Sequence, residues 1–204
     1  MILVAYKKAE GAREELEEAV RRAFSSAENS GYFDEIAARK NDSSARDSLT
    51  ALLLLADTAR KFGIDTGALI LHCGENGKPY FADCTLDFSI SHSRGTVAVA
   101  VSDSGAVGID VEAAQITDDK ARKLAERYFR GDVSRFPEKA TDFLRLWVQR
   151  EAYVKLCGST LAEKIGKEIP EQVKVYDFEI FGHPACVCFM GEQTVRFDAN
   201  PSED

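Results

Sequence analysis

The chain has 204 residues, of which 45% are hydrophobic, and a formal net charge of −8. This composition fits a globular protein of one or two domains, and the acidic balance argues against nucleic-acid binding. No apolar run approaches the ~20 residues of a membrane span, and the apolar start at residues 1–5 is too short for a signal peptide. We therefore expect a soluble cytoplasmic protein with no membrane partner.

The five cysteines are scattered and include no C-x-x-C pair, so the sequence predicts neither a disulfide framework nor a zinc site. Cys186 and Cys188 lie two residues apart in a strand-like stretch. We expect both to be buried, reduced thiols on one face of that strand.

In the first half of the chain, apolar periodicity predicts strands and helices in alternation. The expected elements are a strand at 1–5, a helix within 10–28, a leucine-rich helix that is capped at 42–44 and ends near Gly63, and strands at 68–73 and 97–101. Residues 74–79 form a turn-rich loop, and residues 88–95 begin like a strand and end in a polar loop.

In the second half, the pattern predicts helices followed by strands. The expected elements are a strand at 107–111, helices at 117–129 and 141–156, strands between 172 and 197, and a frayed tail at 200–204. This order indicates an α+β fold of two subdomains, residues 1–105 and 106–204, which pack tightly without a flexible linker.

Asp110 and Glu112 lie two residues apart in the strand-like alternation of residues 107–112, so their side chains project from the same face. Two neighbouring carboxylates repel each other unless a cation lies between them, and Mg²⁺ is a natural candidate. The alternative is an ordinary solvent-exposed pair on a surface strand.

The helix at 141–156 places charged residues on its apolar stripe. Continuing the stripe of Leu144, Trp147 and Val148 leads to Glu151 and Lys155, where a core helix would carry apolar residues. The functional interpretation is an acid–base pair that lines a cleft. The alternative is an exposed Glu–Lys pair on the helix surface.

Several cations and hydroxyls could bind phosphate. His92 follows alternating serines, and its loop combines imidazole, hydroxyl and guanidinium groups, although a lone loop histidine is often structural. The remaining candidates are Lys78 in a Gly-Lys-Pro turn and the cations Arg39, Lys40 and Arg46, for which a solvated surface is the alternative.

Four blocks, taken in order, resemble the 4′-phosphopantetheinyl transferase superfamily, in its long surfactin-synthetase-activator type. They are Gly77-Lys78-Pro79, Phe88–Ser93, Val107-Gly108-Ile109-Asp110-Val111-Glu112 and Trp147–Lys155. The resemblance runs from about Arg46 to Lys155. It implies two similar α+β subdomains with the active site at their interface, and transfer of the phosphopantetheine arm of coenzyme A to a serine of an apo carrier protein.

The resemblance also implies a role for each candidate residue. Asp110, Glu112 and Glu151 would bind Mg²⁺, with Mn²⁺ as an alternative ion; Glu151 would also act as general base and Lys155 would stabilise phosphate charge. His92 would act in catalysis and in coenzyme A binding. The other expected coenzyme A contacts are Arg39, Lys40, Arg46, Lys78, Pro79, Ser91 and Arg150.

Arg150 departs from the family pattern, which usually has lysine there, so we assign it phosphate binding and no proton transfer. We expect a monomer that docks an acidic carrier through an apolar patch of Tyr153, Leu156 and Leu161. Two alternatives remain: a coenzyme A-binding regulatory protein without turnover, and an unrelated Mg²⁺-dependent phosphohydrolase.

Overall fold

The computed structural model describes residues 1–82, 84–129 and 137–198. The predicted tail at 200–204 lies outside these residues. Within them, mixed helices and sheets form the expected α+β fold. No helix of this described part is long and apolar enough to cross a lipid bilayer.

The first sheet has the strand order β4-β5-β1-β9. Its strands are β1 (Ile2–Lys8), β4 (Asp87–Ser93), β5 (Thr96–Ser102) and β9 (Val195–Asp198). The first three are antiparallel neighbours, whereas β9 pairs in parallel with β1. The last described strand of the chain therefore completes the sheet that the first strand begins.

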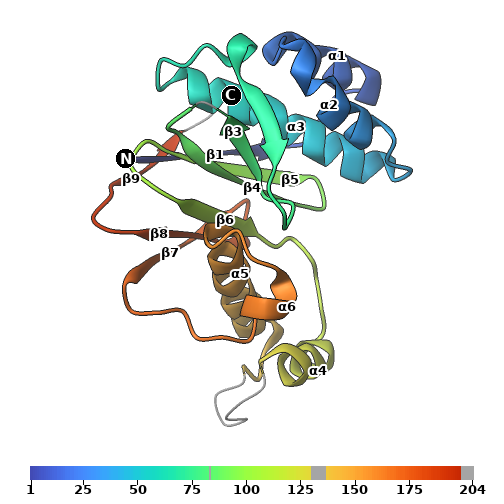
Figure 1. Cartoon of the computed structure of the whole chain (residues 1–204). Helices are drawn as coiled ribbons and strands as arrows, with labels where there is room; N and C mark the ends of the chain where they lie inside the picture. The colour runs from blue at the N-terminus through green and yellow to red at the C-terminus, as the bar shows by residue number, and fades with distance from the viewer. Residues whose placement is uncertain (83, 130–136, 199–204) are drawn as a thin grey trace.

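Three helices cover one face of this sheet, at the top of Figure 1. They are α1 (Arg13–Ala23), α2 (Ser30–Ala37) and α3 (Asp42–Arg60). Asn41 caps α3 by accepting a hydrogen bond from the backbone N–H of Ser44, one residue before the predicted caps. Alternate residues Val97, Val99 and Val101 of β5 pack toward these helices.

The second sheet has the order β6-β8-β7 and lies against the other face of the first sheet. Its strands are β6 (Val107–Val111), β7 (Val173–Ile180) and β8 (His183–Met190). Ala98 and Ala100 of β5 pack against Ile109 and Val187 in the core between the sheets. Because β5 is buried on both faces, its central residues 97–101 are all apolar.

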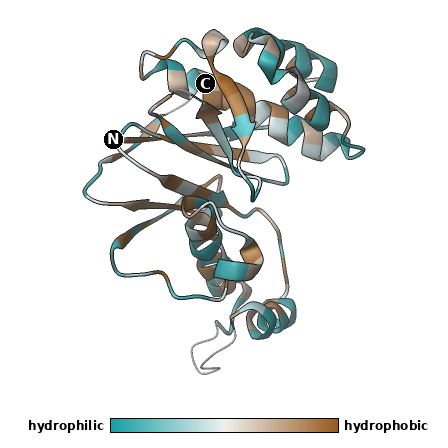
Figure 2. Cartoon of the chain, viewed as in Figure 1, coloured by the Kyte–Doolittle hydropathy of each residue, from teal (hydrophilic) through white to brown (hydrophobic). Residues whose placement is uncertain are grey.

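The helix α5 (Ala140–Leu156) covers the outer face of the second sheet, and α4 (Asp118–Tyr128) packs beside it (Figure 1). The apolar residues are concentrated on the strands, and the outer helices carry many hydrophilic ones (Figure 2). The layers are thus helices, first sheet, second sheet and helix. Cys186 and Cys188 are buried, free thiols under α5, as predicted.

Smaller elements complete the described chain. They are the 3₁₀ turns at Ala27–Asn29 and Thr66–Ala68, the hairpin of β2 (Ile70–Cys73) and β3 (Pro79–Ala82), and α6 (Leu161–Lys164). The subdomain boundary at 105/106 stays a prediction. It falls between β5 and β6, but β9 from the second half belongs to the sheet of the first half.

Candidate active site

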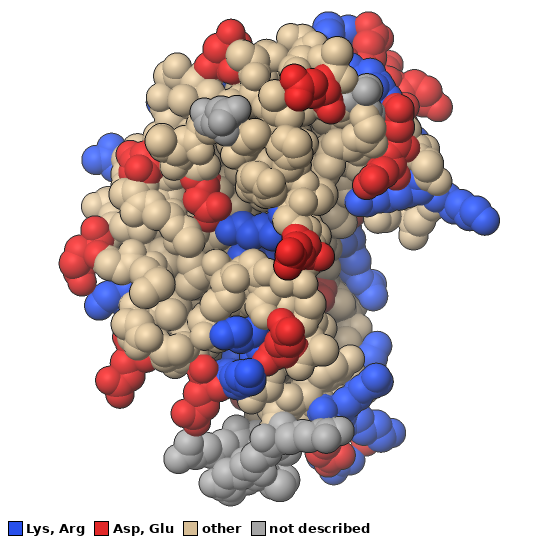
Figure 3. Space-filling view, in the orientation of Figure 1, with Lys and Arg blue, Asp and Glu red and all other residues tan. Residues whose placement is uncertain are grey.

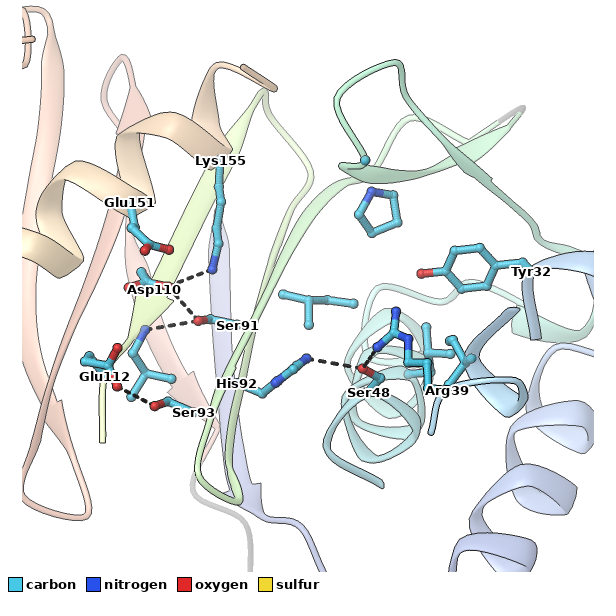
Figure 4. Close-up of a pocket in the computed structure, with 16 residues that line it drawn as sticks. Tyr32, Arg39, Ser48, Ser91, His92, Ser93, Asp110, Glu112, Glu151 and Lys155 are labelled. Atoms are coloured by element: carbon cyan, nitrogen blue, oxygen red, sulfur yellow. Dashed lines mark hydrogen bonds and ion pairs between the residues drawn. The ribbon is translucent and has the colours of Figure 1, made fainter. Parts of the chain in front are cut away.

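A cavity of about 470 Å³ opens where α3, β4, β6 and α5 come together. Figure 4 shows carboxylates and Lys155 at one end, and Arg39, His92 and Tyr32 at the other. Eight predicted site residues line this cavity: Arg39, Pro79, Ser91, His92, Asp110, Glu112, Glu151 and Lys155. The fold therefore gathers residues that lie far apart in the sequence.

Asp110 is the most buried carboxylate of the cavity, at 4% exposure. Its Oδ1 accepts hydrogen bonds from Lys155 Nζ and from Ser91 Oγ, each at 2.7 Å. Burial raises the pKa of the Asp110 carboxyl, and the Lys155 ammonium opposes that rise. The Lys155 ammonium therefore favours the ionised form of a carboxyl that burial disfavours.

Glu151 lies on α5, one turn before Lys155, and faces the same cavity. Burial, followed by the charge of Asp110, raises the pKa of Glu151 to about 7. The side chain is thus neither an ordinary exposed carboxylate nor part of an apolar stripe. A carboxyl with a pKa near neutrality is suited to accept a proton at physiological pH.

Three carboxylates of the cavity are candidate ligands for a divalent cation. In the described ranges, no group of three or more His, Cys, Asp or Glu side chains forms a ready-made metal site. However, Asp110, Glu112 and Glu151 face one cavity together with a single lysine, and their repulsion contributes to the raised pKa of Glu151. This excess of negative charge, carried by oxygen donors, fits a hard cation such as Mg²⁺.

The other end of the cavity is a hydrogen-bonded group around His92. Its Nε2 lies 3.2 Å from Ser48 Oγ, which also accepts from Arg39 Nη1 at 2.6 Å. The buried Asp47 lies 3.8 Å from His92 Nδ1. Burial lowers the pKa of His92 despite the nearby Asp47, so the free protein holds a neutral imidazole at pH 7.

The segment around His92 differs from the prediction of a polar loop, because β4 continues through Ser93. Its residues alternate between two faces: His92 faces Ser48 on α3, whereas Ser91 and Ser93 face β6. Ser91, predicted to contact coenzyme A, lines the cavity and donates its hydroxyl proton to Asp110.

Four predicted contacts do not line the cavity, namely Lys40, Arg46, Lys78 and Arg150. The ammonium of Lys78 donates to Asp87 Oδ2 at 2.9 Å and to the Val107 carbonyl at 3.1 Å, which joins β4 to β6. Burial lowers the pKa of Arg150, opposed by the charge of Glu168. Lys78 therefore makes structural contacts, whereas Nε and Nη1 of Arg150 are buried without a hydrogen-bond partner among the described residues.

Sequence reasoning missed Tyr32, Ser48 and Ser93 as lining residues. The alternation of serines at 89, 91 and 93 was a usable signal, because residues two apart share a face of a strand.

The predicted docking patch is wrong for Tyr153 and Leu156, which are 6% and 7% exposed and belong to the core. Lys and Arg lie among Asp and Glu on the face drawn in Figure 3.

A second cavity, of about 280 Å³, adjoins the carboxylate end. Glu112 and Glu151 line both cavities, so the two carboxylates stand between them. The second cavity is otherwise mostly apolar, with Ile116, Leu124 and Trp147 from the α4–α5 region. The carboxylates are therefore accessible from two sides.

Comparisons with known proteins relate the sequence to a family. Residues 106–188, which include β6, α5 and most of β8, match the sequence model of the 4′-phosphopantetheinyl transferase superfamily. The resemblance predicted from the sequence is thereby confirmed for this segment.

Individual relatives extend the match beyond this segment. The chain is 32% identical over 124 residues to the 4′-phosphopantetheinyl transferase AcpT of Salmonella typhimurium, covering 56% of this chain and 64% of the relative. It is also 32% identical over 115 residues to the 4′-phosphopantetheinyl transferase of Bacillus subtilis, covering 54% and 51%. The matches thus span between half and two thirds of these relatives.

Proposed function

We propose that this chain is a 4′-phosphopantetheinyl transferase that moves the phosphopantetheine arm of coenzyme A to a serine of an apo carrier protein. The observation that carries the proposal is the gathering of Asp110, Glu151 and Lys155 at one end of a cavity whose other end holds Arg39 and His92. Coenzyme A carries phosphates in two places, a diphosphate and a separate 3′-phosphate. We assign the diphosphate to the end with the carboxylates and Lys155, and the 3′-phosphate to the end with Arg39 and His92.

We propose that Asp110, Glu112 and Glu151 hold Mg²⁺, with Mn²⁺ as an alternative ion. The support is the excess of carboxylate charge around the single ammonium of Lys155. A bound Mg²⁺ supplies neutralisation of charge on the diphosphate. Lys155 adds a positive charge next to Asp110, where the leaving group gains negative charge.

In the proposed reaction, the serine Oγ bonds to the β-phosphorus of coenzyme A. The bond from that phosphorus to the bridging oxygen breaks, and adenosine 3′,5′-bisphosphate leaves with the electron pair. The serine proton goes to Glu151, a carboxylate that lines both cavities and is therefore within reach of an entering serine. The second cavity supports entry of the serine from the side opposite coenzyme A.

At the other end, we propose that Arg39 and His92 bind the 3′-phosphate. Both groups share the Ser48 hydroxyl as a partner, so an arriving phosphate meets donors that are already oriented. Pro79 lines the same cavity, in keeping with a contact to the nucleotide. Arg46 and Lys40 are less suited to this role, because neither lines the cavity.

We further propose that the protein works as a monomer in the cytoplasm. All five cysteines of the chain are free, which suits a reducing compartment. The partners are coenzyme A and an apo acyl or peptidyl carrier protein. Sedimentation velocity at working concentration tests the monomer.

The decisive experiment incubates the protein with coenzyme A, Mg²⁺ and a panel of apo carriers. Transfer adds about 340 Da to the carrier serine, as covalent group transfer requires, and intact-protein mass spectrometry detects it. The matched control is the Asp110→Asn variant, which keeps the shape of the side chain. No mass gain on any carrier, with calorimetric binding of coenzyme A, identifies a binding protein instead. Release of nucleotide without a carrier identifies a phosphohydrolase.

A further inference from the structure

The edges of the two sheets meet along β4 and β6 through a ladder of side-chain hydrogen bonds. Every second side chain of β4 accepts a backbone N–H from a residue 20 positions further along the chain. The bonds run to Asp87 from Val107 at 2.7 Å, to Ser89 from Ile109 at 3.1 Å, to Ser91 from Val111 at 3.2 Å, and to Ser93 from Ala113 at 3.1 Å. Side-chain oxygens therefore take the place of a neighbouring strand.

Two of the three serines also hold the carboxylates of the site. Ser91 donates its hydroxyl proton to Asp110 Oδ1 at 2.7 Å, and Ser93 donates to Glu112 Oε1 at 2.5 Å. A serine has one hydroxyl proton, and in both cases it goes to the carboxylate while the oxygen accepts the ladder N–H. Ser89 makes the same ladder bond, but no carboxylate of the described chain accepts from it.

Each carboxylate is held by one oxygen only. Asp110 Oδ1 accepts from both Ser91 and Lys155, and Glu112 Oε1 accepts from both Ser93 and the backbone N–H of Ala114. Among the residues that the structure describes, no hydrogen bond reaches the second oxygen of either group. Both side chains line the cavity, so these second oxygens are available to a ligand.

We propose that Ser91 and Ser93 are positioning residues, which fix the rotation of Asp110 and Glu112 so that Oδ2 and Oε2 together face a divalent cation. The inference rests on the proposed function for the identity of the site. A carboxylate without such a partner must lose rotational freedom when it binds an ion, which weakens binding. Partners of this kind typically change metal affinity by 10–100-fold.

The ladder supplies its own control. Ser89→Ala removes one ladder bond and touches neither carboxylate, whereas Ser91→Ala and Ser93→Ala each remove a ladder bond together with a carboxylate partner. Ser→Thr at 91 and 93 retains the hydroxyl. Ser→Cys at the same positions keeps a side chain of similar shape but replaces the hydroxyl with a weak S–H donor. It therefore tests loss of the hydrogen bond in a protein that retains its packing.

The test measures Mn²⁺ affinity of the intact chain by electron paramagnetic resonance of the free ion, without carrier, alongside transfer activity. Ser91→Ala and Ser93→Ala are expected to raise the Mn²⁺ dissociation constant about 10-fold, and Ser→Cys to act in the same direction. The Ser→Thr variants should retain the wild-type dissociation constant. Ser89→Ala should stay within about twofold of wild type, since it leaves both carboxylate partners in place.

The outcomes separate the two proposals. Equal weakening in all three alanine variants, or unchanged affinity in Ser91→Ala and Ser93→Ala, overturns the positioning role, as does a wild-type chain that binds no Mn²⁺. A wild-type chain that binds Mn²⁺ with the expected serine dependence but transfers nothing to any carrier supports the positioning role and overturns the proposed function.

Discussion

Asp110 accepts hydrogen bonds from β4 through Ser91 and from α5 through Lys155, so one carboxylate connects three elements of the site. Removing the charge of Asp110 leaves the Lys155 ammonium without this ion-pair partner, but the Lys155 side chain is 27% exposed and can be solvated. Function should therefore suffer more than stability at this residue.

We predict that Asp110→Asn lowers transfer by about 100-fold or more, as expected when one charge-stabilising group of an active site is lost. The unfolding free energy should change by only about 1 kcal/mol, because the amide keeps the shape and one acceptor oxygen. Mass-spectrometric transfer rates and urea unfolding measure the two effects. A variant that transfers at the wild-type rate would remove Asp110 from the site.

Glu151 links stability to pH in the metal-free protein. Its pKa is about 7 in the folded chain and 4.5 in the reference state, so the folded state binds the proton more tightly. The contribution of Glu151 to the free energy of unfolding is therefore fully present below pH 4.5 and declines as the pH rises toward 7. Where only the unfolded chain is ionised, the slope is ~1.4 kcal/mol per pH unit.

We predict that Glu151→Gln flattens this decline, because glutamine does not titrate. Urea unfolding between pH 4.5 and pH 8, in the presence of a chelator, measures the difference. Glu10→Gln, at an exposed position, is the control and should keep the wild-type slope. An unchanged slope in Glu151→Gln would place the titrating group elsewhere.

At the residue scale, sequence periodicity predicted that Asp110 and Glu112 share a face, and the structure has both in one cavity. It could not predict that Lys78 bonds Asp87 and Val107, because a lysine in a turn has no periodic signal for its partner. The destination of the Ser91 hydroxyl likewise depends on β6, which is brought alongside only by the tertiary fold.

Gly108 determines how closely α5 approaches β6. A Cβ at this position would lie 2.0 Å from the Ala152 carbonyl oxygen and 2.4 Å from the Leu156 nitrogen, both in the helix backbone. Only glycine permits this approach, which brings Glu151 and Lys155 over Asp110. The glycine before the two acids is thus a requirement of packing between elements.

We predict that Gly108→Ala destabilises the protein by about 1–3 kcal/mol or more, the usual cost of overpacking a core. It should also reduce transfer beyond the loss of folded protein, because α5 must shift together with its two site residues. Gly31→Ala in α2 is the matched control: its Cβ meets open space, and the change should be neutral or stabilising by up to ~1 kcal/mol. Unfolding curves and rates of the folded fraction measure both variants.

Element prediction succeeded where apolar periodicity was strong, as in α3, α5 and β6. It missed α2, because eight mixed residues give little periodic signal. It ended β4 too early, because Ser91, His92 and Ser93 are polar on both faces of the strand. These residues contact polar partners on α3 and β6, and such partners cannot be inferred from local sequence.

At the scale of the whole molecule, aromatic side chains link the edges of the two sheets. Phe197 of β9 meets Phe178 of β7 with ring centroids 4.9 Å apart in an edge-to-face arrangement, and Tyr176 lies 6.0 Å away. Phe197 is 40% exposed, so exposure alone would class it as dispensable. The contact instead joins the last strand to the opposite sheet.

We predict that Phe197→Ala destabilises the fold by about 1–2 kcal/mol, less than a fully buried phenylalanine would cost. A double-mutant cycle with Phe178→Ala should give a coupling of about 0.5–1.5 kcal/mol, as expected for an aromatic pair. Chemical unfolding of the four proteins measures it. Strict additivity would show that the two sheets are held together by the central core alone.

The pairing of β1 with β9 has a consequence for the time course of synthesis. Residues 2–5 are made about 190 residues before their partners, residues 195–198. At usual ribosomal rates the interval is roughly 10–40 s. During this interval the edge of β1 that later pairs with β9 has no neighbouring strand, and an unpaired edge can pair with other chains. The nascent chain is therefore most open to edge-to-edge aggregation before residues 195–198 emerge and cover β1.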